Sequence, residues 1–311
     1  MPGRFGHGAP SWQPRSGLVW GGSRHWILGI INATPDSFSD GGDVTSADAA
    51  VVVARRMALA GADGVDIGGE STRPGAEAVD EAEQIRRVVP VIAAIREALP
   101  ELLISVDTTR AAVAGAAIGA GADVINDVSG GGDDAAILAL AAERKVGVIL
   151  MHRLRLPRAD VASTQYGEGW YGSSVPAPVA GDVVERVKAA MADMLHRAEM
   201  AGIEPDRVLL DPGLGFGKTV RQNAELIEGT PKLLTLGRPV LSALSRKSFV
   251  GAMSGVSPDG DPKRRLAGTL ALSMLHATAG ASVFRVHDVG PCREALSVLA
   301  NVALVARSGG A

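Results

Sequence analysis

Three polar side chains follow apolar runs with the composition of buried β-strands. Asp107 follows Leu-Leu-Ile-Ser-Val, Asn126 follows Val-Ile, and Asp211 follows Val-Leu-Leu. A carboxylate at the end of a buried strand needs hydrogen-bond donors, because its ionised form is otherwise expensive to bury. A structural role stays open for each residue, since Asp107 before Thr108-Thr109 could cap a helix. The three together favour a shared polar ligand.

Basic residues at other strand ends indicate that this ligand carries an anionic group. Arg73 is flanked by Gly-Gly and Pro-Gly pairs, which allow close backbone approach, and its guanidinium offers a fork of donors to phosphate oxygens. Lys247 follows the seventh predicted strand. Arg285 and His287 alternate with Val286 at the end of the eighth, so both leave the strand on the same face. The pattern predicts a phosphate site.

Two loops have the composition of ligand-covering segments. Residues 32–42 combine turn formers and small polar groups with one aromatic residue, Phe38, which is unfavourable in a polar loop unless it closes over something. Residues 211–219 are rich in glycine and include Phe216. This second loop ends in Gly-Lys-Thr like a nucleotide-binding P-loop, but Pro212 stands where that motif requires its first glycine. We therefore reject nucleotide binding by this loop and expect Phe216 to form one wall for a flat ligand.

Eight short apolar runs alternate with segments of helical spacing. The predicted strands are 26–31, 64–67, 102–106, 123–125, 146–151, 207–210, 239–244 and 282–286. The predicted helices are 47–60, 78–99, 111–119, 134–142, 182–201, 221–234, 262–279 and 293–306. This order fits either an open doubly wound sheet or a (β/α)8 TIM barrel, both α/β folds. Because nearly every strand ends in a polar residue, and a barrel gathers all strand ends at one face, we predict the barrel.

The chain divides into a main domain with short extensions. Residues 1–25 are rich in Gly, Pro and Arg and are expected to form a flexible extension without a signal peptide; 26–306 form the barrel and 307–311 a tail. Residues 153–181 form a long connection that is either functional or mobile. Among 311 residues, 46% are hydrophobic and the net charge is −3, which argues against a nucleic-acid or membrane partner. The single cysteine suits a reducing cytoplasm.

Taken together, the motifs resemble the dihydropteroate synthase family. The segments that carry the resemblance are INATPDSFSDGG, DIGGESTRPGA, SVDTTR, INDVSGG, DPGLGFGK, SRKS and RVHDV, in this order, over about residues 26–306. The resemblance implies a (β/α)8 barrel enzyme of folate biosynthesis and a target of sulfonamides. As a transferase of this family it would condense 6-hydroxymethyl-7,8-dihydropterin pyrophosphate with p-aminobenzoate to 7,8-dihydropteroate and pyrophosphate. It also implies Mg²⁺ as cofactor and a cytoplasmic homodimer.

The resemblance assigns roles to individual residues of this chain. It implies that the pterin is bound by Asp107, Asn126, Asp211, Lys247 and Arg285, the phosphates by Arg73, Arg285 and His287, p-aminobenzoate by Phe38, Thr72, Pro74, Phe216 and Ser245, and Mg²⁺ by Asn32. Arg73, Asp107, Lys247 and His287 would act in catalysis. These residue types suit their assigned roles. A pterin edge offers paired N–H donors to a carboxylate such as Asp211, and the amide oxygen of Asn32 is a hard ligand for Mg²⁺.

Two segments depart from the family pattern. Arg153-Leu154-Arg155 stands where the family commonly has a methionine and a glycine, and Ala243 stands at a usual glycine, followed by Leu244. An added methyl group beside a tightly held ligand can clash, so altered substrate fit is expected there, and Leu244 is expected to change the shape of the pocket further. Two alternative functions therefore remain open at the level of sequence. One is a pterin-binding paralogue without synthase activity, and the other is a pterin-dependent methyltransferase.

Overall fold

The computed structural model describes residues 10–21, 24–33, 46–71, 78–166, 183–257 and 260–308. Within them, one sheet of parallel strands has the order β8-β7-β6-β5-β4-β3-β10-β9. Its strands are β3 (Trp26–Asn32), β4 (Gly64–Gly68), β5 (Leu103–Asp107), β6 (Val124–Asp127), β7 (Gly147–Met151), β8 (Val208–Asp211), β9 (Leu241–Ser242) and β10 (Val283–Val286). The two sheet edges meet in a parallel bridge between Leu210 and Val240. The sheet thus closes into the predicted barrel.

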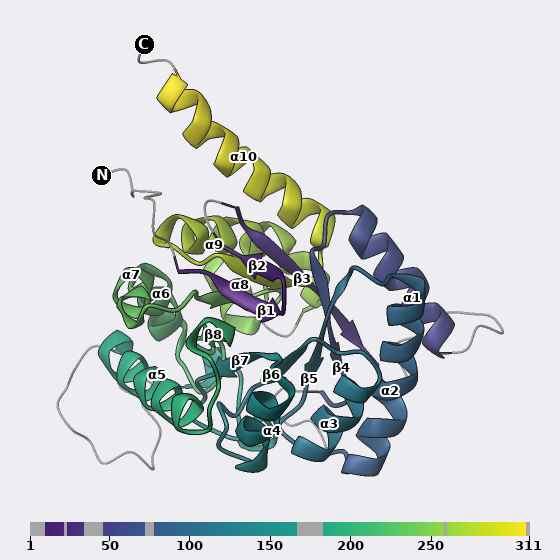
Figure 1. Cartoon of the computed structure of the whole chain (residues 1–311). Coiled ribbons are helices and arrows are strands. Elements are labelled where there is room, and N and C mark those ends of the chain that lie inside the picture. The colour runs from purple at the N-terminus through teal and green to yellow at the C-terminus, as the bar shows by residue number, and fades with distance from the viewer. Residues whose placement is uncertain are drawn as a thin grey trace.

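Helices follow the strands and surround the barrel (Figure 1). They are α1 (Ser46–Leu59), α2 (Glu81–Ala98), α3 (Ala111–Gly119), α4 (Ala136–Arg144), α5 (Val183–Met200), α6 (Val220–Glu228), α7 (Thr230–Leu233), α8 (Ser248–Met253), α9 (Leu266–Ala279) and α10 (Val289–Ser308). One predicted helix, 221–234, is divided into α6 and α7, where Pro231 has no N–H to continue the first helix. Helix α8 was not predicted. None of the helices in the described part of the chain is long and apolar enough to cross a membrane.

The core has two layers because side chains alternate along each strand. On β5, Leu103 belongs to the cluster inside the barrel, whereas Ile104 packs with the surrounding helices. On β10, Val283 faces inward and Phe284 faces the helices. Both layers are closely packed, so the strand ends are held on a rigid support.

A hairpin closes the barrel at the amino-terminal ends of its strands. It consists of β1 (Trp12–Arg15) and β2 (Leu18–Trp20), drawn in purple in Figure 1. Trp12 is fully buried, and its indole N–H donates to the carbonyl of Arg207 over 2.9 Å. Trp20 stacks on Trp26 with ring centroids 4.9 Å apart. The prediction of a flexible extension over residues 1–25 is therefore wrong for this hairpin, because its tryptophans bury large apolar surfaces. Residues 1–9 lie outside the described part.

The strand register brings the carboxyl ends to one level. Gly68 pairs with Asp107, and Asp107 pairs with Asn126 on the next strand. Asn32 lies at the same level on β3, paired with Gly68. After β7, the chain forms two short 3₁₀ turns, Pro157–Ala159 and Ser163–Gln165. The polar strand ends predicted from sequence thus form one mouth of the barrel.

Candidate active site

One half of the barrel mouth is a network of charged side chains around Arg285. Its Nε donates to Asp66 Oδ2 over 2.6 Å, and one terminal nitrogen donates to Asp107 Oδ2 over 2.9 Å. Asn126 Nδ2 donates to the same oxygen of Asp66 over 3.0 Å. The side chains of Asp66, Asp107 and Arg285 are 0%, 6% and 18% exposed. Three predicted pterin ligands, Asp107, Asn126 and Arg285, therefore lie together.

Burial sets the protonation of this network. Two carboxylates share one guanidinium, which cannot neutralise both of them. Burial raises the pKa of Asp107 to about 7; Arg285 opposes the rise and the neighbouring Asp66 adds to it. Asp107 therefore changes between proton donor and proton acceptor near neutral pH, which suits a group that contacts a heterocycle carrying both kinds of partner.

The other half of the mouth is built around Asp211 and Lys247. Asp211 Oδ1 accepts from the backbone N–H of Gly213 over 2.7 Å, and burial raises the pKa of this carboxyl while Lys247 opposes the rise. Lys247 Nζ donates to the carbonyl of Leu214 and lies 4.2 Å from the centre of the Phe216 ring. Burial lowers the pKa of Lys247 to about 8, against the pull of Asp211. The predicted pterin ligands on β8 and after β9 are thus also adjacent to each other.

Lys218, the lysine of the Gly-Lys-Thr sequence, forms hydrogen bonds to the backbone around it. Lys218 is fully buried, and its Nζ donates to the carbonyls of His152, Gly213 and Phe216 over 3.3, 2.8 and 3.0 Å. Burial lowers its pKa to about 7. Because its donors are directed at backbone carbonyls, the ammonium group is not placed to bind a nucleotide phosphate. This geometry agrees with the rejection of a P-loop.

A third group of predicted residues lies after β9 and β10. The hydroxyl of Ser245 and Nδ1 of His287 are 3.1 Å apart. The neighbouring Arg246 is held by Asp288 through Nε over 2.8 Å and a second hydrogen bond of 2.5 Å. The guanidinium of Arg246 is therefore held in an ion pair with Asp288. Ser245 and His287 face each other beside the strand end that carries Arg285.

Several predicted residues fall outside the described part of the chain. They are Phe38, Thr72, Arg73 and Pro74, with most of the segment 32–42. Their assigned roles stay predictions. Asn32 is described and exposed at the end of β3. The described residues contain no group of three or more His, Cys, Asp or Glu side chains able to hold a metal. A single amide oxygen at the mouth fits a Mg²⁺ ion that keeps waters and takes its other ligands from substrate phosphates.

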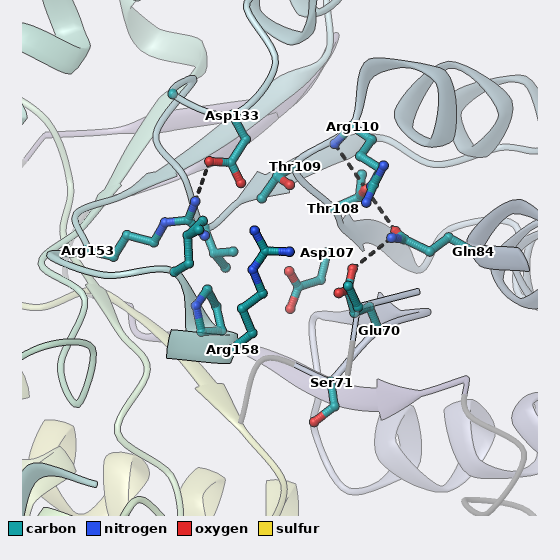
Figure 2. A pocket seen from close by; sticks show the side chains of 15 residues that line it. Glu70, Ser71, Gln84, Asp107, Thr108, Thr109, Arg110, Asp133, Arg153 and Arg158 are labelled. Atoms are coloured by element: carbon teal, nitrogen blue, oxygen red, sulfur yellow. Dashed lines mark hydrogen bonds and ion pairs between the residues drawn. The ribbon is translucent and has the colours of Figure 1, made fainter. Parts of the chain in front are cut away.

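A cavity of about 410 Å³ opens beside the charged network. Figure 2 shows Asp107 between Arg153 and Arg158 on one side and Glu70 and Gln84 on the other. Glu70 accepts from Gln84 Nε2 over 2.7 Å, and Arg153 pairs with Asp133. The cavity gives solvent and ligands access to Asp107.

In the second departure from the family pattern, the side chains of Ala243 and Leu244 lie in different clusters. Ala243 is 7% exposed and belongs to the cluster inside the barrel, so its methyl group faces the interior as expected. Leu244 packs instead with the cluster between β-strands and helices. The expectation that Leu244 reshapes the pocket is therefore wrong, because its side chain packs behind the strands, away from the cluster that contains Ala243. Arg153 lines the cavity next to Asp107.

Asp66 is the functional residue that sequence reasoning missed. It lies within the apolar run of β4 and not at its end, and it is completely buried. A carboxylate inside an otherwise apolar strand is itself a signal, because burial without a partner is costly. Its partners Asn126 and Arg285 are 60 and 219 residues away, so no local pattern identifies them.

The fold and the site define a barrel enzyme whose strand ends can bind a flat, polar and anionic molecule. The family profile "Pterin binding enzyme" matches residues 28–287. Dihydropteroate synthase of Synechocystis sp. is 41% identical over 282 residues, which cover 91% of this chain and 90% of the relative. The chain belongs to the pterin binding enzymes and, within them, to the dihydropteroate synthase family.

Solved structures agree with this assignment. Dihydropteroate synthase of Xanthomonas albilineans with 4-aminobenzoic acid has a TM-score of 0.81 and 41% identity, covering 95% of this chain and 98% of its own. The same enzyme in complex with 7,8-dihydropteroate has a TM-score of 0.78 and 39% identity, covering 94% of this chain and 99% of its own. The similarity therefore extends over nearly the whole barrel.

Proposed function

We propose that this protein is a dihydropteroate synthase, which condenses 6-hydroxymethyl-7,8-dihydropterin pyrophosphate with p-aminobenzoate. The observation that carries the proposal is the convergence of Asp107, Asn126 and Arg285 with Asp211 and Lys247 at one barrel mouth. These are carboxylate, amide and cationic groups that match the donors and acceptors of a pterin. High-coverage relatives of the same name support the assignment.

The pterin ring is held between the two halves of the mouth. Asp211 accepts the paired N–H groups of the pterin edge, and Lys247 donates to the ring carbonyl. Phe216, which lies against Lys247, forms a wall for p-aminobenzoate together with Ser245. Arg285 stays beside Asp66 and Asp107 and presents its face to the ring. These contacts hold the substrates so that the amine nitrogen reaches the exocyclic carbon of the pterin.

The reaction replaces a carbon–oxygen bond with a carbon–nitrogen bond. The p-aminobenzoate amine supplies the electron pair for the new carbon–nitrogen bond, the bonding pair of the broken carbon–oxygen bond leaves with pyrophosphate, and the amine releases one proton to solvent. His287 and Arg73 stabilise the departing charge, and Asp107 lies where it can support positive charge on the pterin. When bound through Asn32 and substrate phosphates, Mg²⁺ would add charge neutralisation for the leaving group.

The test is a pterin titration followed by a product assay. Isothermal titration with the pterin pyrophosphate and Mg²⁺ should show binding, and addition of p-aminobenzoate should yield dihydropteroate and pyrophosphate. Pterin binding without turnover would instead identify a binding paralogue. Arg73→Ala is expected to lower turnover by about 100-fold or more while sparing pterin binding, since it removes one leaving-group contact. Sulfonamides are expected to compete with p-aminobenzoate.

We also propose an assembly state and a location for this protein. A homodimer through α9 and α10 is supported by exposed Leu275, Val298 and Val302, which are 59%, 58% and 62% exposed. Exposed apolar side chains grouped on neighbouring helices are typical of an interface. Light scattering of the purified protein tests this directly, and a monomer at all concentrations would contradict it. We also propose a cytoplasmic location, which fits the single buried cysteine.

A further inference from the structure

The segment after β7 is packed closely against the loop after β8. A Cβ atom on Gly213 would lie 1.8 Å from the carbonyl oxygen of His152, and one on Gly217 would lie 2.7 Å from Cβ of Leu154. Both glycines have positive φ values, 67° and 65°. The long connection predicted to be either functional or mobile is thus fixed to its neighbour over residues 152–166. Residues 167–182 lie outside the described part.

Asp160 is the polar centre of this contact. Its side chain is buried, with 5% of the residue exposed. One carboxylate oxygen accepts from the backbone N–H of Gly217 over 2.9 Å. The other accepts from the backbone N–H of Val161 over 2.9 Å and from the hydroxyl of Tyr166. Asp160 therefore joins the segment after β7 to the loop that carries Phe216.

The same loop determines where Lys247 lies. The carbonyl of Leu214 accepts from Lys247 Nζ, and the Phe216 ring lies beneath that nitrogen. Gly215 leaves space for the lysine stem, since a Cβ there would lie 2.7 Å from Lys247 Cδ. A displacement of the loop would therefore move both Phe216 and Lys247.

We propose that Asp160 is a positioning residue of the active site, which fastens the loop after β8 and thereby sets the place of Phe216 and Lys247. The proposal rests on the proposed function insofar as these two residues contact substrate. It adds a residue whose hydrogen bonds are to Val161, Tyr166 and Gly217, in the connection that follows the altered residues 153–155.

The charge of Asp160 should act on Lys247 as well. Besides burial, which lowers its pKa, Lys247 experiences the carboxylates of Asp211, Asp107 and Asp160, which raise it, and Arg285, which lowers it. Lys218 lies in the same loop, where the charge of Lys247 lowers its pKa and the carboxylate of Asp160 raises it. Neutralising Asp160 while keeping its shape is expected to make Lys247 release its proton at lower pH.

The experiment compares wild type with Asp160→Asn, Tyr166→Phe and Asp206→Asn. The ligand-free protein is labelled competitively with limiting acetic anhydride over a pH series. Mass spectrometry of the peptide that contains Lys247 then gives the titration curve of this lysine. For Asp160→Asn we expect the midpoint to move to lower pH, because a carboxylate that favours the charged form of Lys247 is removed. Tyr166→Phe keeps the charge and should leave the midpoint unchanged. Asp206→Asn removes an exposed carboxylate at the opposite end of the barrel, before β8, and should also leave it unchanged.

Steady-state kinetics supply the second measurement. Asp160→Asn should raise KM for the pterin pyrophosphate about fivefold with little change in kcat, because the contacts it positions bind the ring throughout the reaction. An unchanged Lys247 midpoint in Asp160→Asn, or an equal shift in Asp206→Asn, would overturn the proposal. If wild type lacked synthase activity, the proposed function would fail, while the labelling result would still decide the role of Asp160.

Discussion

The two halves of the barrel mouth hold buried charge in different ways. On the side of β4, β5 and β10, charged side chains pair with one another, with Arg285 between Asp66 and Asp107. On the side of β8 and β9, Lys218 and Lys247 donate to backbone carbonyls of one loop. The first half therefore depends on partners far apart in sequence, whereas the second depends on the conformation of its loop. Their responses to mutation should differ accordingly.

The largest effect is expected from Arg285→Met. Removal of the guanidinium leaves two buried carboxylates without their cation, and breaking such a group lowers the free energy of unfolding by about 2–4 kcal/mol. Urea unfolding near neutral pH measures this, and pterin affinity should fall by about 100-fold or more. Arg246→Met is the matched control, since it breaks a partly exposed pair with Asp288 and should cost about 1 kcal/mol or less. Equal losses in both variants would contradict the special role of the network.

Lys218→Met should have a smaller effect on stability. It leaves three carbonyls without a donor and removes a cation near Asp211 and Asp160, but both carboxylates keep their backbone hydrogen bonds, so the free energy of unfolding should fall by about 1–2 kcal/mol. Because the loop after β8 loosens, KM for the pterin substrate should rise. Amide hydrogen exchange localised to residues 211–219 is the measurement. Unchanged protection there would show that the loop does not depend on this lysine.

The pH dependence of stability distinguishes the network from the loop. The pKa of Asp107 is raised to about 7 in the folded state, so the folded state binds more protons than the unfolded state between the ordinary carboxyl pKa and about pH 7. Stability contributed by this site therefore falls as pH rises through that window. Asp107→Asn should remove this trend and gain about 1–2 kcal/mol relative to wild type between acidic and neutral pH. Parallel stability curves would exclude the expected titration of Asp107.

Ala243→Gly is expected to have the smallest effect. The methyl group lost is inside the barrel, and the added backbone freedom should cost about 0.5–1 kcal/mol. If this methyl group restricts the pterin, affinity should improve by about threefold, which titration calorimetry can resolve. Unchanged affinity would show that the family's glycine is not required for fit in this chain.

Much of the fold was predictable because its signals are local. Alternation of apolar residues marks the strands, and a Gly-Ala pair at several helix ends marks the turn back to the sheet. The predicted strand over residues 64–67 is observed as 64–68, and that over 146–151 as 147–151. The hairpin over residues 12–20 was missed because its stability comes from Trp12 and Trp20 meeting the barrel interior, a contact without a local signature.

The sequence by itself determined which side chains end the barrel strands, and therefore that Asp107, Asn126, Asp211 and Arg285 meet at one face. Only the tertiary structure decided how they are paired. In the folded chain Asp66 pairs with Arg285, Lys218 donates to backbone carbonyls, and Asp160 joins two loops. The physical reason is that these pairs form across barrel strands and loops, after closure has brought distant residues within hydrogen-bonding distance. Local sequence patterns determine the strands, whereas the hydrogen-bond and ion-pair partners at the mouth depend on closure of the barrel.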